Sequence, residues 1–238
     1  MIRHLALLVT VALAAGCASV SGSAERGDII RKIVASTVQL RSEREGVRRA
    51  ASGVVIASDA ASPRSWVLTT RHFLDARESQ PVSIRRGAVR AVAKVAVIGI
   101  DVDLAILEVP GVALPGVTLK DVAQLGDEVW VVAFPWGRRL TVVSGVVSQL
   151  AGEDGEPVVA GAPRMIDASV SYGSSGGGVF DIVTGALIGI VEGYRTARMT
   201  TREERALEIP VAGETTIISS RAIRSFLGTT SVPGPPDD

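Results

Sequence analysis

The sequence has 238 residues, of which 47% are hydrophobic and 21% are charged. Its 25 basic and 25 acidic residues cancel to a formal net charge of zero, and they are mixed along the chain without a dense basic block. This balance excludes nucleic-acid binding and polybasic membrane contact as expected functions, while the length fits one large domain with a sizeable core.

Residues 1–16 have the features of a bacterial secretory signal. A basic start precedes an apolar run from Leu5 to Ala15, which is too short to span a bilayer, since a spanning helix needs about 20 residues. The run ends in Leu-Ala-Ala-Gly-Cys, which resembles a bacterial lipobox. We therefore expect Cys17 to be lipidated and to become the new N-terminus; the alternative is an ordinary signal peptide with an incidental cysteine.

Cys17 is the only cysteine, so no intramolecular disulfide can form and the exported domain must be held by its hydrophobic core. Residues 17–28 are small and polar, and we expect them to be a flexible tether between the lipid anchor and the folded domain. By resemblance to other bacterial lipoproteins, Ala18 favours the outer membrane. The expected location is therefore the periplasmic face of that membrane.

From Thr37 onward, short runs of β-forming residues alternate with turn residues, which is typical of an all-β sandwich or barrel. Just before them, residues 29–34 fit either a short helix or a strand. The predicted strands are Val38–Leu40, Gly53–Ile56, Trp66–Thr69, Val82–Ile84, Val92–Ile98, Leu104–Val109, Val129–Phe134, Leu140–Val147, Val158–Val159, Met165–Asp167, Gly178–Asp181, Ala186–Val191 and Thr215–Ile218.

One helix is predicted near the end of the chain, over residues 219–227. A serine cap precedes Ile223, Phe226 and Leu227 at helical spacing, and Gly228 ends the run. The tail, residues 229–238, contains three prolines and two acidic residues and little apolar content, so we expect it to be disordered.

Once the leader is removed, a single histidine remains, His72, in the sequence Val-Leu-Thr-Thr-Arg-His-Phe-Leu. Asp103 follows in Asp-Val-Asp-Leu-Ala-Ile-Leu, and Ser175 in Gly-Ser-Ser-Gly-Gly-Gly. The order His, Asp, Ser is that of chymotrypsin-like barrels, whereas subtilisins have Asp, His, Ser. The pattern Gly-x-Ser-x-Gly also occurs in α/β-hydrolases, but these need a histidine after the serine, and none follows here. The order therefore predicts a serine hydrolase of the chymotrypsin type.

The segments 67–74, 101–109 and 167–180 resemble the trypsin-like serine peptidases, most closely the bacterial HtrA/Deg branch, as does the Ser-Gly-Val-Val stretch that begins at Ser52. The resemblance covers about residues 28–227. It implies an all-β domain over 29–228 with two antiparallel six-stranded β-barrels, about 35–115 and about 120–218, and the short C-terminal helix. No room remains for a PDZ domain, and trimers are an option by resemblance only.

The resemblance also implies a role for each residue of the triad. Ser175 is the nucleophile, His72 takes its proton and later gives it to the leaving amine, and Asp103 fixes the imidazole tautomer. The backbone N–H groups of Gly173 and Ser175 form the oxyanion hole. Asp101 is the competing acid, and Asp103 is preferred because family members place the acid immediately before Leu-Ala.

The specificity pocket is expected between segments 167–172 and 190–194. Its candidate lining residues are Ser169, Tyr172, Ile190, Val191 and Glu192. Because Ser169 stands where trypsins carry an acid that binds arginine or lysine, we expect a small aliphatic or other uncharged side chain before the scissile bond.

Three departures from the family pattern leave a second function open. Gly178 replaces a usual proline, Arg71 replaces a small or amide residue as either an exposed rim residue or a contact for an acidic substrate, and Glu192 replaces a small hydroxyl residue near the catalytic acid. The Glu192 carboxylate would repel Asp103, point into the cleft or face the surface, and the surface orientation is favoured.

The main interpretation is a membrane-tethered serine endopeptidase that hydrolyses proteins or peptides through an acyl-enzyme. The alternative is a catalytically silent lipoprotein of the same fold that serves as a binding or scaffold protein. One mature histidine and no cysteine besides Cys17 make a metal cluster unexpected, and without a nucleotide fingerprint we expect no cofactor.

Overall fold

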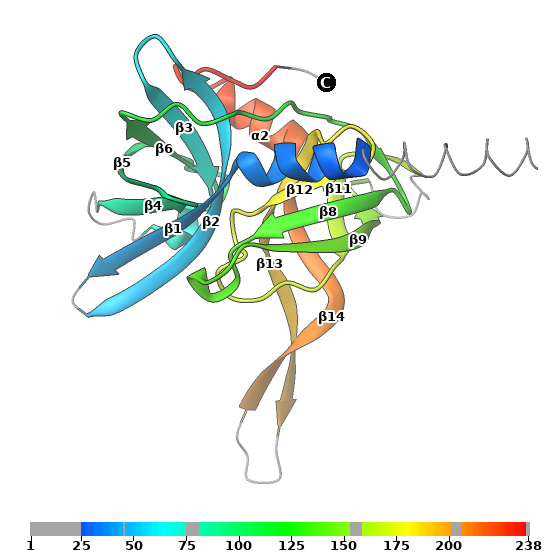
Figure 1. Cartoon of the computed structure of the whole chain (residues 1–238). Coiled ribbons are helices and arrows are strands. Elements are labelled where there is room, and N and C mark those ends of the chain that lie inside the picture. The colour runs from blue at the N-terminus through cyan, green and yellow to red at the C-terminus, as the bar shows by residue number, and fades with distance from the viewer. Residues whose placement is uncertain (1–24, 45, 75–80, 153–158, 201–205, 237–238) are drawn as a thin grey trace, which may run out of the picture.

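The structure is a computed structural model that describes residues 25–44, 46–74, 81–152, 159–200 and 206–236. The signal segment, Cys17 and residues 18–24 of the predicted tether lie outside this part of the chain. Within it, no helix has the length and hydropathy needed to cross a membrane. The strands form two closed antiparallel barrels, as predicted, and a short helix, α2, follows them (Figure 1).

Barrel one contains the first six strands in the hydrogen-bonded order β1-β2-β3-β6-β5-β4. Each of the six strands predicted between residues 38 and 109 overlaps one of these elements, and β1, β2 and β5 extend further than predicted. The strands are β1 Thr37–Arg44, β2 Val47–Asp59, β3 Arg64–Thr69, β4 Val82–Arg86, β5 Val89–Ile98 and β6 Ala105–Pro110.

Barrel two has the order β11-β14-β13-β12-β8-β9. A separate two-stranded sheet of β7 and β10 lies beside it. A strand was predicted at 158–159; Val159 is not in a strand, and residue 158 lies outside the described part. The elements are β7 Ala123–Gln124, β8 Glu128–Ala133, β9 Thr141–Leu150, β10 Ala160–Gly161, β11 Pro163–Asp167, β12 Gly178–Asp181, β13 Leu187–Thr200 and β14 Ala206–Ser219.

The core has three parts: the two barrel interiors and the space between the barrels. Val55 faces the interior of barrel one, and its neighbour Val54 packs between the barrels against Phe180. Successive side chains of a strand point to opposite faces, so both faces of these strands are buried. This double burial explains the near-continuous apolar runs in the sequence.

Two helices pack against the region between the barrels. The first covers residues 25–35 and buries Ile33, so residues 29–34 are helical and the last four residues of the predicted tether belong to the helix. The second, α2 (Ser220–Leu227), has Ser219 as its N-cap, because the Ser219 side chain accepts a hydrogen bond from the Ala222 N–H. The predicted C-terminal helix is therefore confirmed.

Residues 229–236, in the tail expected to be disordered, make contacts with the folded domain. Val232 packs against the cluster between the barrels, and the Leu119 N–H donates a hydrogen bond of 3.1 Å to the Pro236 carbonyl. Residues 237–238 lie outside the described part.

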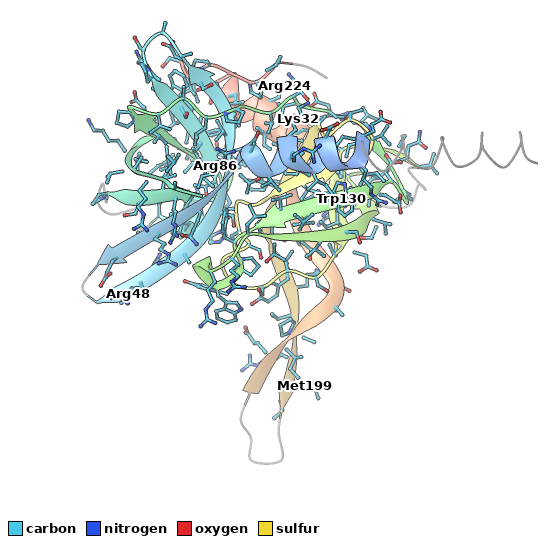
Figure 2. All side chains as sticks on the ribbon, viewed as in Figure 1. Lys32, Arg48, Arg86, Trp130, Met199 and Arg224 are labelled. Carbon is cyan, nitrogen blue, oxygen red and sulfur yellow. The ribbon has the colours of Figure 1, made fainter. Side chains whose placement is uncertain are left out.

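Barrel two carries an arm that the sequence analysis missed. β13 and β14 each have 14 residues, and their pairing continues outward from the barrel to Thr200↔Ala206. Figure 1 shows this two-stranded arm projecting from the barrel, and Figure 2 labels Met199 on it. Residues 194–200 are exposed, so this stretch lacks the alternation of apolar and polar residues by which a half-buried strand is predicted.

Candidate active site

His72 and Asp103 lie side by side at one edge of barrel one. His72 belongs to the 3-10 helix η1 (Arg71–Phe73) that follows β3, and Asp103 precedes β6. The His72 Nδ1 and Asp103 Oδ2 atoms are 2.5 Å apart, and the His72 backbone N–H donates to Oδ1 at 2.8 Å. With the carboxylate ionised, Nδ1 carries the proton, so Nε2 is left as the acceptor.

The electrostatics of Asp103 favour its ionised form. Burial alone would raise the pKa of this carboxyl, but hydrogen bonds from the His72 side chain and backbone and the positive charges of His72 and Arg71 bring the pKa below its ordinary value of 3.8. Asp101, the competing acid, is exposed. Of the two aspartates, Asp103 is the one that the structure places on the histidine.

Arg71 supports the loop that carries Asp103. Its Nη1 atom donates to the carbonyls of Gly99 and Ile100 at 2.9 and 2.5 Å, and its Nε lies 4.0 Å from Asp103 Oδ1. From the sequence, Arg71 was interpreted as an exposed rim residue or as a contact for an acidic substrate. The contacts found here are instead with the loop before Asp103. Arg71 is a positioning residue for the acid, and the pattern around His72 did not reveal it.

Ser175 lies in the tight loop before β12. The loop is closed by hydrogen bonds from the Gly177 N–H to the Ser174 carbonyl and from the Gly176 N–H to the Val191 carbonyl, both 2.8 Å. Gly173 has a φ of 88°, which glycine adopts without strain. Among the hydrogen bonds of the described residues, neither the Gly173 nor the Ser175 N–H is a donor, so both amides are available to an anion in the cleft.

Ser52, on β2, ties the loop of Ser175 to barrel one. Its hydroxyl donates to the Gly173 carbonyl at 2.8 Å and accepts from the Phe134 N–H at 2.8 Å, and its backbone N–H donates to the Ser175 carbonyl at 2.9 Å. Ser52 is fully buried. The Ser-Gly-Val-Val match pointed to this stretch but gave no role to the serine.

The glycine at position 178 has a packing reason. A Cβ atom built there would come within 2.3 Å of the Phe180 ring and 3.0 Å of Val54 Cγ2. The ring of Phe180 therefore occupies the space that a larger residue, such as the usual proline, would need. This departure from the family pattern follows from packing between the barrels.

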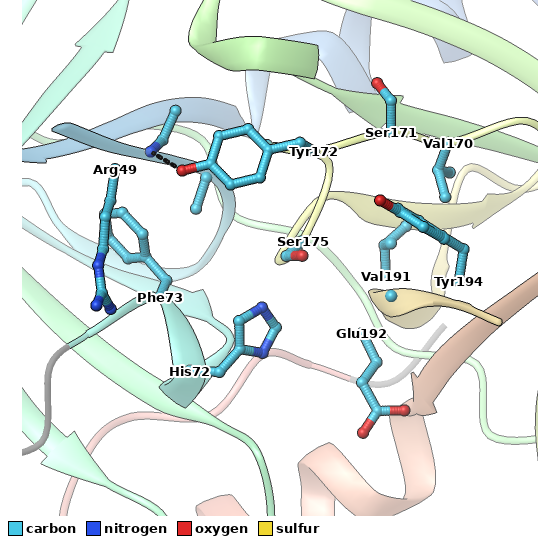
Figure 3. Close-up of a pocket in the computed structure, with 14 residues that line it drawn as sticks. Arg49, His72, Phe73, Val170, Ser171, Tyr172, Ser175, Val191, Glu192 and Tyr194 are labelled. Atoms are coloured by element: carbon cyan, nitrogen blue, oxygen red, sulfur yellow. Dashed lines mark hydrogen bonds between the residues drawn. The ribbon is translucent and has the colours of Figure 1, made fainter. Parts of the chain in front are cut away.

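His72 and Ser175 face a common cleft of about 480 Å³ (Figure 3). The predicted pocket residues Tyr172, Val191 and Glu192 line this cleft together with further residues that the sequence analysis missed. Glu192 lines the wall of the cleft and is half-buried, and in Figure 3 its carboxylate points away from Ser175. The further residues include Phe73, Val170, Ser171 and Tyr194.

Two predicted pocket residues do not line the cleft, which corrects the sequence analysis. Ile190 is fully buried and packs between the barrels, because it points to the opposite face of β13 from its neighbour Val191. Ser169 is exposed outside the cleft. Val170 and Val191 are the apolar residues that line the cleft in this region.

Comparison with known proteins places this site in a family. The model of the trypsin-like peptidase domain matches residues 51–190, a segment that contains His72, Asp103 and Ser175. The chain belongs to the trypsin-like peptidase family. Within the described residues, no group of three His, Cys, Asp or Glu side chains is arranged to hold a metal ion.

A curated relative agrees with this assignment. The "Probable periplasmic serine endoprotease DegP-like" of Chlamydia trachomatis is 28% identical over 159 residues, which are 64% of this chain and 29% of that protein. This chain thus spans less than a third of that relative.

The active form of the Rv3671c protease from M. tuberculosis is 24% identical, with a TM-score of 0.65 over 87% of this chain and 86% of that one. The serine endoprotease from Yersinia pestis is 20% identical, with a TM-score of 0.63 over 86% of this chain and 65% of that one. These two structures show the shared fold.

Proposed function

We propose that this protein is a serine endopeptidase that cleaves polypeptides through an acyl-enzyme. The observation that carries the proposal is the hydrogen-bonded pair of His72 and Asp103, which shares a cleft with Ser175 and two unengaged backbone amides. Each component that acyl transfer needs is represented: a nucleophile, a base, an orienting acid and donors for the oxyanion.

The reaction proceeds in two halves. Ser175 Oγ attacks the peptide carbonyl while His72 Nε2 takes its proton, and the oxyanion of the tetrahedral intermediate accepts hydrogen bonds from the Gly173 and Ser175 N–H groups. The C–N bond then breaks, and His72 donates the proton to the leaving amine. A water molecule, deprotonated by His72, releases the acyl group in the same manner. Asp103 stays ionised throughout and stabilises the imidazolium.

An extended substrate fits the edge of β13. The pairing of β13 with β12 ends at Ile190, so its edge from Glu192 to Tyr194 faces the cleft beside Ser175. An unpaired edge accepts an extended peptide by backbone hydrogen bonding. Val170 and Val191 give the adjoining wall an apolar character, which favours an uncharged side chain before the scissile bond.

A fluorophosphonate probe tests the nucleophile directly. We expect stoichiometric labelling of the wild-type chain and none of Ser175→Ala, because only an activated serine hydroxyl reacts with the phosphorus centre. Intact-protein mass spectrometry measures the adduct, and Ser174→Ala, next to the nucleophile but buried, is the control that retains labelling. An unlabelled wild type under varied activating conditions would instead support the silent binding or scaffold protein.

We also propose that the peptidase is tethered to the periplasmic face of a bacterial membrane through Cys17, which lies outside the described residues. The lipobox-like sequence supports this. Wild-type protein expressed in a Gram-negative host is expected to sediment with membranes and to incorporate labelled palmitate, whereas Cys17→Ser is expected to lose both properties. Cys17→Ser that still sediments with the outer membrane would contradict the lipid tether.

A further inference from the structure

A second cavity of about 860 Å³ adjoins the catalytic cleft. The two cavities share Arg49, Ala50 and Tyr172, so they are continuous at this point. The second one lies on the outside of barrel one, over β1, β2, β4 and β5, and it reaches η2 (Pro135–Gly137). We call it the arginine groove.

The arginine groove has a strong charge bias. Six arginines and one glutamate line it, although the chain as a whole has zero formal net charge. The arginines are Arg41, Arg48, Arg49, Arg85, Arg90 and Arg138. Such a concentration of one sign of charge in a concave surface attracts ligands of the opposite sign.

The pairing of β4 with β5 places two of these arginines next to each other. Arg85 on β4 lies directly opposite Arg90 on β5, a like-charge pair that destabilises a sheet. Ile84, which precedes Arg85 on β4, is buried and packs in barrel one, so the arginines are not needed for the core. In the part of the chain that the structure describes, no carboxylate pairs with Arg85, Arg90 or Arg138.

An aromatic pair stands where the groove meets the catalytic cleft. The Trp136 and Tyr172 rings have centroids 5.5 Å apart, and the Trp136 backbone N–H donates a hydrogen bond to the Tyr172 carbonyl at 2.6 Å. Trp136 adopts a φ of 57°, which is costly for a bulky residue, and its side chain is 63% exposed. The fold thus holds a large apolar ring in contact with solvent at the boundary of the two cavities.

The direction of the substrate follows from the site. Val170, Val191 and Tyr194 lie on one side of Ser175, whereas Arg49 and Phe73 lie on the other (Figure 3). If the residue before the scissile bond uses the valine-lined wall, the chain after the bond leaves past Arg49 toward the arginine groove. Resting on the endopeptidase function, we propose that the groove binds acidic residues of the substrate on the C-terminal side of the scissile bond.

Binding to the full chain with Ser175→Ala tests the groove without turnover. Two fluorescent peptides share the same residues up to the scissile bond and continue with six glutamates or six glutamines. We expect about tenfold tighter binding of the glutamate peptide at low salt, by fluorescence anisotropy, because several exposed ion pairs of modest strength add up. The difference should shrink as salt shortens the Debye length.

The double variant Arg85→Gln/Arg90→Gln is expected to bind the glutamate and glutamine peptides with equal affinity. The matched control is Arg221→Gln, an exposed arginine on α2 that does not line either cavity. Equal affinities for the two peptides, or a preference that survives the double substitution, would overturn the proposal. An oligonucleotide of equal charge that binds more tightly than the glutamate peptide would overturn it in favour of a nucleic acid.

Turnover by the wild-type chain separates this proposal from the proposed function. We expect kcat/KM to rise when glutamates follow the scissile bond and not when they precede it. An equal gain on either side would refute the direction of binding. A chain that fails to cleave or react with the probe, yet prefers the glutamate peptide through Arg85 and Arg90, would refute the endopeptidase and leave the acidic-peptide site standing.

Discussion

Asp103→Asn is expected to lower kcat for peptide hydrolysis about 10⁴-fold at neutral pH. The amide can donate a hydrogen bond to Nδ1, which moves the ring proton to Nε2 and removes the acceptor that Ser175 needs. Steady-state kinetics on a peptide with valine before the scissile bond measures the effect. The variant should fold, since the amide keeps the size of the carboxylate.

The matched control is Asp101→Asn, two residues away and exposed. Its kcat is expected to stay within a factor of about two of the wild type, because surface changes away from special features have small effects. If Asp101→Asn were the more damaging of the two, the assignment of the acid to Asp103 would be wrong.

The effect of Asp103→Asn on the free energy of unfolding is expected to depend on pH. The pKa of Asp103 in the folded state lies below its ordinary value of 3.8, so ionisation of Asp103 favours folding. That contribution is complete above the ordinary pKa and disappears as the pH falls through the lower folded-state pKa. The difference in free energy of unfolding between wild type and Asp103→Asn, measured in urea, should therefore be larger at pH 6 than at pH 3.

Ser52→Ala is expected to impair both stability and reaction with the probe. The substitution leaves the buried Phe134 N–H and the Gly173 carbonyl without the Ser52 hydroxyl as partner, and each unsatisfied buried group costs about 1–3 kcal/mol. We expect the free energy of unfolding to fall by about 2–4 kcal/mol. The rate of fluorophosphonate labelling should fall by more than tenfold, because Gly173 carries one oxyanion donor.

Ser65→Ala is a closely matched control on β3. Its hydroxyl is also fully buried, donates to the Val112 carbonyl at 2.8 Å and accepts from the Leu114 N–H at 2.9 Å, but it lies outside the cleft. We expect a similar loss of stability with normal labelling of the folded fraction. Equal labelling rates for the two variants would show that Ser52 has no effect on the site beyond stability.

Local signals in the sequence predicted an all-β sandwich or barrel, and the resemblance to the trypsin-like peptidases added the two six-stranded barrels and the choice of Asp103 as the acid. β-forming runs and turn residues indicated the strands, and the order of His72, Asp103 and Ser175 indicated the type of site. The C-terminal helix was predicted from a serine cap and apolar spacing, which are also local. The strand and helix signals depend on residues close together in the sequence, and the order of His72, Asp103 and Ser175 can be read along the chain without knowing its fold.

The features that were missed depend on residues far apart in the sequence. Ser52 and Gly173 are 121 positions apart in the sequence, and no local pattern predicts the hydrogen bond between them. Ile190 faces away from the cleft because of how β13 is placed in barrel two, and that placement is set by strands distant in the sequence. The arginine groove combines strands of barrel one with Tyr172, so only the folded chain brings its charges together.

The division of the triad between the barrels has a thermodynamic consequence. His72 and Asp103 come from barrel one and Ser175 from the loop of barrel two, while the apolar cluster that contains Val54 and Phe180 joins the two halves. Neither half holds a complete site, so assembly of the site is coupled to the free energy of docking one barrel on the other. A small slippage at this junction would separate Ser175 from His72 while both barrels remained folded. Reaction of Ser175 with the fluorophosphonate probe should therefore report on this junction more sensitively than secondary structure or bulk unfolding.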